Sequence, residues 1–224
     1  MRRILALLLA AVLAGPALLA QSDEVQRVKD AVIVLSEVMD AGDQAIPASI
    51  LEKAEAVAVF PSLIKAGFII GGQRGRGILS VRDPKTGAWS SPAFLTITGG
   101  SIGAQIGGQA VDLILVVQNR RGLEQLVRNQ FRIGAGASVA AGPVGRDASA
   151  TTDIQLRAQI LSYSRTRGLF AGVSLEGSTI SQDRDANDRL YGMGYRTGQI
   201  VFEGRGGAPE PVDEWKAALR KYAK

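Results

Sequence analysis

The chain has 224 residues, 27 of them glycine, and a formal net charge of +5 at neutral pH. It contains neither histidine nor cysteine, which excludes Ser-His-Asp and Cys-His nucleophile systems, the usual zinc sites and every disulfide. Any acid–base chemistry would have to come from Asp, Glu, Lys or Tyr. The mild positive charge fits an anionic partner surface but does not require one.

The first 20 residues have the features of a cleavable secretory leader. A basic start is followed by the apolar stretch Ile4 to Leu13, which is too short to span a bilayer, and then by small residues. Cleavage after Ala17 and cleavage after Ala20 both fit this pattern. The sequence therefore predicts an exported chain, periplasmic, outer-envelope associated or secreted, in which residues 21–224 form one domain.

Two long segments and one short one have the signals of helices. Apolar residues at steps of three and four give residues 23–41 one hydrophobic face, while the polar positions carry five acidic and two basic residues. Pro47 fits the first turn of a short second helix that ends at Lys53. Residues 212–223 are predicted to form a C-terminal helix with Trp215 on its apolar side.

The segments between these helices are predicted to be mainly β-strands. Ala56 to Phe60 is an uninterrupted apolar run that Pro61 should end. Further strands are expected over residues 68–70, 78–81, 94–98, 112–118, 131–140 and 169–176. The fold class that follows is α+β: a single β-dominated domain with a curved, largely antiparallel, glycine-rich sheet flanked by an N-terminal amphipathic helix, short connecting helices and a C-terminal helix.

Three connecting segments are harder to assign from their composition. Gly122 to Asn129 is predicted to be a short helix between strands. Ile154 to Ser164 fits either a helix or a strand, and the helix is favoured. Gly177 to Asn187 is polar and is expected to be a surface connection.

The glycine clusters do not form a nucleotide-binding motif. Gly103 to Gly108 has the spacing of a P-loop, but Gln109 and Ala110 stand where Lys and Ser or Thr would be required. Tight turns, bulges and close strand packing explain the glycines better. Residues 86–111 carry no charge, yet they contain too many polar groups for a membrane-spanning helix. No cofactor and no metal are predicted.

Basic residues gather beside the glycine-rich segments and in a second run over residues 120–132. They predict an anion-attracting surface, with an ordinary solvated face as the alternative. The candidate lipid- or anion-binding residues are Lys65, Arg74, Arg76, Arg120, Arg121, Trp215, Lys216 and Arg220. Nucleic acid is not expected as a partner, because aromatic residues make up only 5% of the chain and do not alternate with the basic runs.

Four long stretches, in order along the chain, resemble the SYLF domain family. They are Ala54 to Gly77, Trp89 to Asp112, Gly134 to Arg146 and Leu161 to Gly177. The resemblance implies a non-catalytic domain that associates with membrane lipids, including phosphoinositides in eukaryotic members, some of which are also described as actin-binding. In those members the lipid contact is attributed largely to a basic N-terminal helix, whereas the corresponding helix here is acidic.

Three hypotheses of function follow. The first is an exported, periplasmic or envelope-associated protein that binds membrane phospholipid without catalysis, with actin an unlikely partner in that compartment and any protein partner unknown. The second is a structural or assembly protein of the envelope that binds another protein through exposed sheet edges. The third and least favoured is an enzyme built on carboxylates, with Asp112, Asp147, Asp153 and Glu176 as its candidates.

Overall fold

The computed structural model describes residues 23–67, 70–102, 107–134, 139–144, 158–166, 169–170, 174–192, 194–206 and 210–223. Its central strands are β1 (Ala56–Gly67), β2 (Ile70–Val81), β3 (Ala93–Ile102) and β4 (Gly107–Val117). Its shorter strands are β5 (Gln130–Arg132), β6 (Val139–Ala141), β7 (Ile160–Thr166), β8 (Leu169–Phe170) and β9 (Thr179–Gln182).

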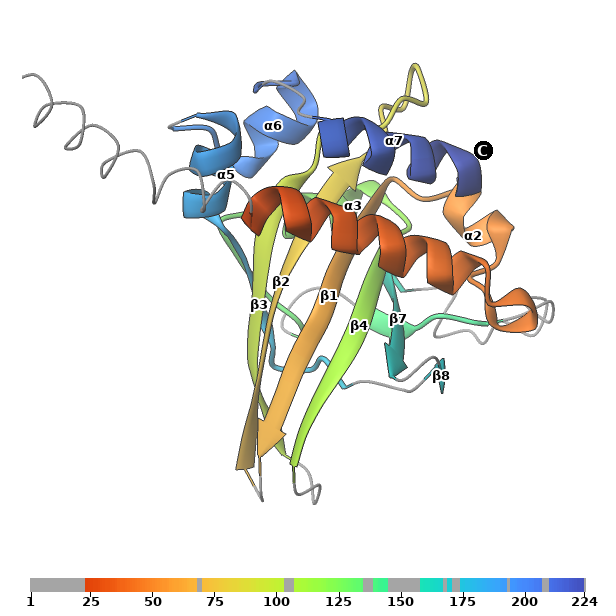
Figure 1. Cartoon of the computed structure of the whole chain (residues 1–224), viewed down its shortest axis with the longest axis vertical. Coiled ribbons are helices and arrows are strands. Elements are labelled where there is room, and N and C mark those ends of the chain that lie inside the picture. The colour runs from red at the N-terminus through yellow and green to blue at the C-terminus, as the bar shows by residue number, and fades with distance from the viewer. Residues whose placement is uncertain are drawn as a thin grey trace, which may run out of the picture.

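These strands form one curved sheet in the order β5-β9-β3-β2-β1-β4-β7-β6, with β8 paired to β7 (Figure 1). The pairing of β6 with β7 is parallel, and the other pairings are antiparallel. The long central strands are rich in β-branched and aromatic residues and have buried side chains on both faces near one end. The predicted α+β class with a largely antiparallel sheet is therefore confirmed.

Helices cover one end of this sheet. They are an N-terminal helix over residues 23–39, η1 (Gly42–Gln44), α2 (Ala48–Glu52), α3 (Arg120–Leu126), α5 (Arg184–Tyr191), α6 (Thr197–Glu203) and α7 (Glu210–Tyr222). The N-terminal helix and α7 lie across the same face of the sheet (Figure 1). Within the described residues, no helix combines the length and the apolarity needed to cross a bilayer.

Strand β1 runs through Pro61, where the sequence analysis expected it to end. Val59 pairs with Ile78 and Ile64 pairs with Arg74, so residues 60–63 of β1 stand opposite only residues 75–77 of β2. This extra residue is a β-bulge, a position where proline is tolerated because its missing N–H is not needed for a ladder hydrogen bond. The strand therefore continues beyond the proline instead of ending at it.

Two connecting segments differ from their predictions. The helix favoured over Ile154 to Ser164 is wrong for residues 160–164, which belong to β7, and residues 154–157 lie outside the described part. Gly177 to Asn187 is not a simple surface connection, because it contains β9 and the start of α5. Its polar Asn187 is fully buried and accepts a hydrogen bond from the backbone N–H of Phe94 on β3 at 2.8 Å.

The expected strands over residues 131–140 and 169–176 are each shorter in the structure. The first is divided into β5 and β6, with residues 135–138 outside the described part. Of the second, the described residues contain only β8, residues 171–173 lie outside the described part, and residues 176–177 form a turn. The predicted leader and most of the segment with P-loop spacing also lie outside the described residues.

The N-terminal helix is fixed to α5 and to the residue before it by partly buried ion pairs. Glu24 is fully buried, and its Oε1 accepts hydrogen bonds from Arg189 Nη2 at 2.8 Å and Nε at 3.2 Å. Arg27 donates from Nη1 to Asp183 Oδ2 at 2.9 Å, and its guanidinium lies 5.1 Å from the ring centroid of Phe94. The acidic face of this helix is therefore partly a packing surface.

Candidate functional site: a groove lined by arginines beside Phe202

The structure separates the basic residues of the sheet that the sequence analysis grouped. Ile64 pairs with Arg74 and Lys65 pairs with Gln73, so Lys65 lies on the opposite face from Arg74 and Arg76. Arg74 and Arg76 are exposed. Lys65 is half-buried, and its burial lowers the pKa of its ammonium group.

The other candidate residues of the sequence analysis lie on two helices. Arg120 and Arg121 are exposed on α3. On α7, Trp215 is fully buried and donates its indole N–H to Ser80 Oγ at 2.8 Å, while Lys216 is half-buried and Arg220 is exposed. The structure thus disperses the set over the sheet, α3 and α7, and its common binding role stays a prediction.

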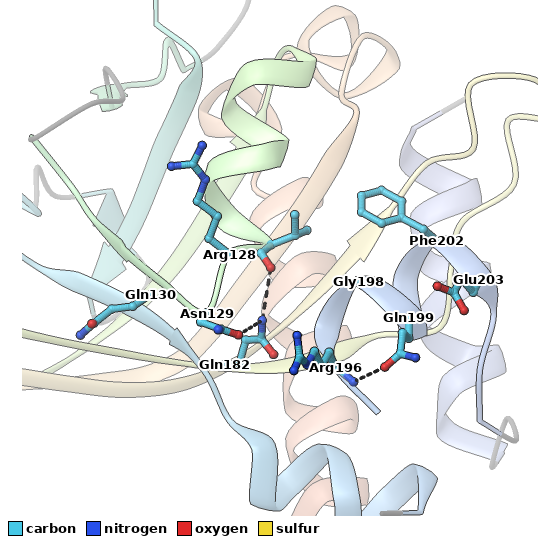
Figure 2. Close-up of a pocket in the computed structure, with 10 residues that line it drawn as sticks. Arg128, Asn129, Gln130, Gln182, Arg196, Gly198, Gln199, Phe202 and Glu203 are labelled. Carbon is cyan, nitrogen blue, oxygen red and sulfur yellow. Dashed lines mark hydrogen bonds between the residues drawn. The ribbon is translucent and has the colours of Figure 1, made fainter. Parts of the chain in front are cut away.

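A groove of about 700 Å³ lies beside the end of α3 and along α6 (Figure 2). Its lining comes from three segments that are far apart in the sequence: Val127, Arg128, Asn129 and Gln130 after α3, Gln182 at the end of β9, and Arg196, Gly198, Gln199, Phe202 and Glu203 in and before α6. Figure 2 shows Arg128 and Phe202 on opposite sides, with Gln182 and Arg196 between them.

The floor of the groove is fixed by the side chain of Gln182. Its Nε2 donates to the backbone oxygen of Val127 and to Oδ1 of Asn129, each at 3.2 Å, and its Oε1 accepts from the backbone N–H of Thr197 at 3.3 Å. One amide therefore joins the turn after α3, β9 and the first turn of α6. Because every bond is made within the protein, the groove exists before any ligand binds.

An aromatic ring and a guanidinium form one wall. Phe202 is 45% exposed, and the guanidinium carbon of Arg120 lies 5.2 Å from its ring centroid, a cation–π contact between α3 and α6. Phe202 also lines an adjoining cavity of about 240 Å³ that includes Arg82 and Trp89. The ring of Phe202 therefore lines both the groove and this cavity.

The cations of the groove differ in their pairing. Arg128 and Arg196 are exposed, and within the described residues neither guanidinium has a carboxylate at ion-pair distance. The acidic residue of the groove, Glu203, is already paired with Arg205 at 3.4 Å. As far as the described residues show, the groove therefore presents two arginines without an ion pair beside an exposed aromatic ring.

Sequence reasoning noted Arg128 within a basic run but missed Phe202, Arg196 and Gln182. Phe202 follows the buried residues Ile200 and Val201, so its hydrophobic character gave no sign that it is exposed. The part played by Gln182 depends on contacts with segments distant in sequence, for which the sequence contains no local signal.

The carboxylates considered for an enzyme serve other purposes or lie outside the described residues. Asp112 accepts from the backbone N–H of Ser62 at 3.0 Å and pairs with Arg165 at 3.6 Å. Asp147 and Asp153 lie in segments that are not described, and Glu176 is exposed in a turn. In the described part of the chain, no three carboxylates are grouped as metal ligands would be.

In this α+β domain the groove carries an exposed phenylalanine and two arginines that have no carboxylate partner among the described residues, and both residue types are enriched where proteins meet. The chain belongs to the SYLF domain family. Its residues 98–222 match the family model described as Ysc84, Las17-binding protein actin regulator.

Proteins similar to this chain occur in animals and fungi. SH3 domain-containing YSC84-like protein 1 of Homo sapiens is 35% identical over 171 residues, which cover 76% of this chain and 48% of that protein. LAS seventeen-binding protein 3 of Saccharomyces cerevisiae is 33% identical over 184 residues, covering 81% and 39%. An SH3 domain-containing protein of Schizosaccharomyces pombe is 36% identical over 173 residues, covering 76% and 40%. The chain thus spans less than half the length of these relatives.

These comparisons correct the predicted function, location and partners. The relatives are eukaryotic proteins named for SH3 domains or for binding LAS seventeen, and the family is described as an actin regulator. The predictions of an exported, periplasmic, secreted or envelope-associated protein, whether lipid-binding or structural, are therefore wrong. The names point to protein partners where membrane phospholipid was predicted, and the prediction of actin as an unlikely partner is also wrong. The name LAS seventeen-binding protein 3 describes a binding protein.

Proposed function

We propose that this domain is a non-catalytic protein-binding domain that takes part in an actin-regulating assembly. The observation that carries the proposal is the exposed ring of Phe202, held against Arg120 at the edge of a preformed groove. The family description and the name LAS seventeen-binding protein 3 support the same class of partner.

The geometry of the groove suits protein binding in two respects. Its floor is held by the hydrogen bonds of Gln182, so little of the protein has to be ordered when a partner binds. Its wall combines phenylalanine with arginine, side chains that often contribute most of the binding energy at interfaces. The contact would therefore be centred on Phe202.

The test compares binding of the unmodified chain and of Phe202→Ala to immobilised LAS seventeen and to actin filaments. We expect the unmodified chain to bind at least one of them, and the substitution to weaken that binding by about tenfold or more, as for a central aromatic residue of an interface. Ile33→Ala is the matched control, because Ile33 is 52% exposed but lies on the N-terminal helix.

Thermal unfolding of each variant confirms that it is folded before binding is measured. The proposal is overturned if the unmodified chain binds neither protein. It is also overturned if Phe202→Ala binds as well as Ile33→Ala, because the groove would then make no contribution.

A further inference from the structure

The chemistry of the groove indicates what kind of partner segment it fits. We infer that the groove binds an acidic peptide segment of a partner protein, with carboxylates on Arg128 and Arg196 and an apolar side chain against Phe202. This inference rests on the proposed function and specifies the ligand of the same site.

The charges of the groove favour an acidic ligand. Within the described residues, Arg128 and Arg196 have no carboxylate partner, whereas Glu203 is neutralised by Arg205. A guanidinium presents a planar fork of N–H donors that matches the two oxygens of a carboxylate. An acidic side chain at each arginine would therefore complete pairs that the described part of the chain leaves open.

The aromatic wall of the groove favours a ligand that also has an apolar side chain. The guanidinium of Arg120 lies over the ring of Phe202 and also pairs with Glu124 at 3.2 Å, so Arg120 is already engaged on both sides. The part of the ring that remains exposed offers an apolar contact rather than a charged one. A ligand that carries only negative charge would leave this surface unused.

The dimensions of the groove distinguish a peptide from a small anion. Arg128 follows α3 and Arg196 precedes α6, and the groove between them has a volume of about 700 Å³. An extended peptide advances about 3.3 Å per residue, and its alternate side chains, which point to the same face, can reach both arginines and the phenylalanine. The side-chain amides of Asn129, Gln130 and Gln199 also line the groove. The oxygens of Asn129 and Gln199 already accept hydrogen bonds within the protein, so these two side chains would offer their N–H groups to the carbonyl oxygens of the peptide.

The test measures fluorescence anisotropy of a labelled peptide in which pairs of acidic residues alternate with pairs of Leu, so that each face of the extended chain carries both kinds of side chain. A second peptide of equal length carries Asn and Gln in place of the acids. We expect the acidic peptide to bind, to bind less tightly as salt is raised, and to bind at least about tenfold more tightly than the neutral peptide.

Two double variants with the same change of charge locate the site. Arg128→Gln with Arg196→Gln should weaken binding of the acidic peptide by about tenfold or more. Arg74→Gln with Arg76→Gln removes two exposed arginines of the sheet, away from the groove, and should leave the affinity within about twofold. Equal losses in the two variants would mean that only net charge matters, and this would overturn the inference.

Two further outcomes decide between ligands and between proposals. If inorganic phosphate or vesicles of anionic phospholipid displace the peptide at lower concentration than free acidic peptide does, the ligand is not a carboxylate segment and the inference is overturned. If Phe202→Ala loses LAS seventeen or actin while the acidic peptide neither binds nor competes, this inference fails and the proposed function stands.

Discussion

The arginines that hold the N-terminal helix and the arginines that line the groove carry the same charge in opposite surroundings. The side chain of Arg27 is 8% exposed and is paired with Asp183, whereas Arg128 and Arg196 are exposed without a carboxylate partner in the described residues. The first kind holds two helices together, and the second kind has charge available for another molecule. Pairing, and not basic composition, therefore distinguishes the cations that hold this fold from those that we propose bind a partner.

The largest expected effect on the free energy of unfolding comes from removing the ion pairs of Glu24. Glu24→Gln should lower the free energy of unfolding by about 2–4 kcal/mol, because it leaves buried Arg27 and partly buried Arg189 with less compensating charge. Arg189 is 39% exposed, so solvent recovers part of the loss. Urea denaturation measures the change, with the exposed Asp23→Asn as control. A loss no greater than that of the control would show that this network does not hold the helix.

A second prediction concerns Trp215, a core residue that should affect stability but not binding. Trp215→Phe should lower the free energy of unfolding by about 2 kcal/mol, because it removes the hydrogen bond to Ser80 and part of a fully buried side chain. Its binding to protein partners should be unchanged. Lys216→Ala on the same helix is the control, with an expected change within about 0.5 kcal/mol. A Trp215→Phe variant that keeps its stability but loses binding would place Trp215 in the binding surface.

Asp83 is expected to have a smaller, pH-dependent effect. The backbone N–H groups of Thr86 and Lys85 donate to its Oδ1 at 2.9 and 2.8 Å and lower the pKa of its carboxyl group. Because this pKa is lower in the folded protein than in the unfolded chain, the stabilisation is present above the unfolded value and is lost as pH falls through the folded value.

The measurement for Asp83 is the thermal midpoint of unfolding as a function of pH. For Asp83→Asn the fall of the midpoint between about pH 5 and about pH 2.5 should be shallower than for the unmodified chain, because one titrating group is lost. Equal slopes would show that these two hydrogen bonds do not favour the ionised carboxyl.

The smallest expected effect on stability is that of the unpaired arginines. Arg128→Gln with Arg196→Gln should change the free energy of unfolding by no more than about 0.5 kcal/mol, because neither side chain makes an ion pair in the described structure. A loss above about 1 kcal/mol in urea denaturation would mean that these arginines serve the fold, and the comparison with Arg27 would fail.

The sequence predicted those parts of the fold that have a local period. The 3.6-residue pattern located the N-terminal helix and α7, and the apolar runs located the starts of β1 and β3 and the ends of β2 and β4. The short strand β7 was assigned to a helix, because its pattern over Ile160 to Ser164 fits both structures. β9 was missed because polar residues surround its single fully buried residue, Ile180.

The candidate site could be predicted only in part, because its geometry depends on long-range contacts. The basic run that contains Arg128 was visible in the sequence, but its position opposite Phe202 requires α3 and α6 to meet across Gln182. The charge of Glu24 predicted an exposed residue, whereas its burial depends on Arg189, which is 165 residues away. Neither contact leaves a periodic signal.

The bulge in β1 also indicates where the chain could lose one residue without losing its fold. Because residues 60–63 stand opposite residues 75–77, β1 has one residue more than the ladder requires between the pairs Val59 with Ile78 and Ile64 with Arg74. Removing Ser62 would let the strand run straight and leave both pairs in register. A central strand of a sheet ordinarily tolerates no single-residue deletion, since every later side chain would change face. In this sheet, the bulge is the place where a shorter chain could keep the same fold.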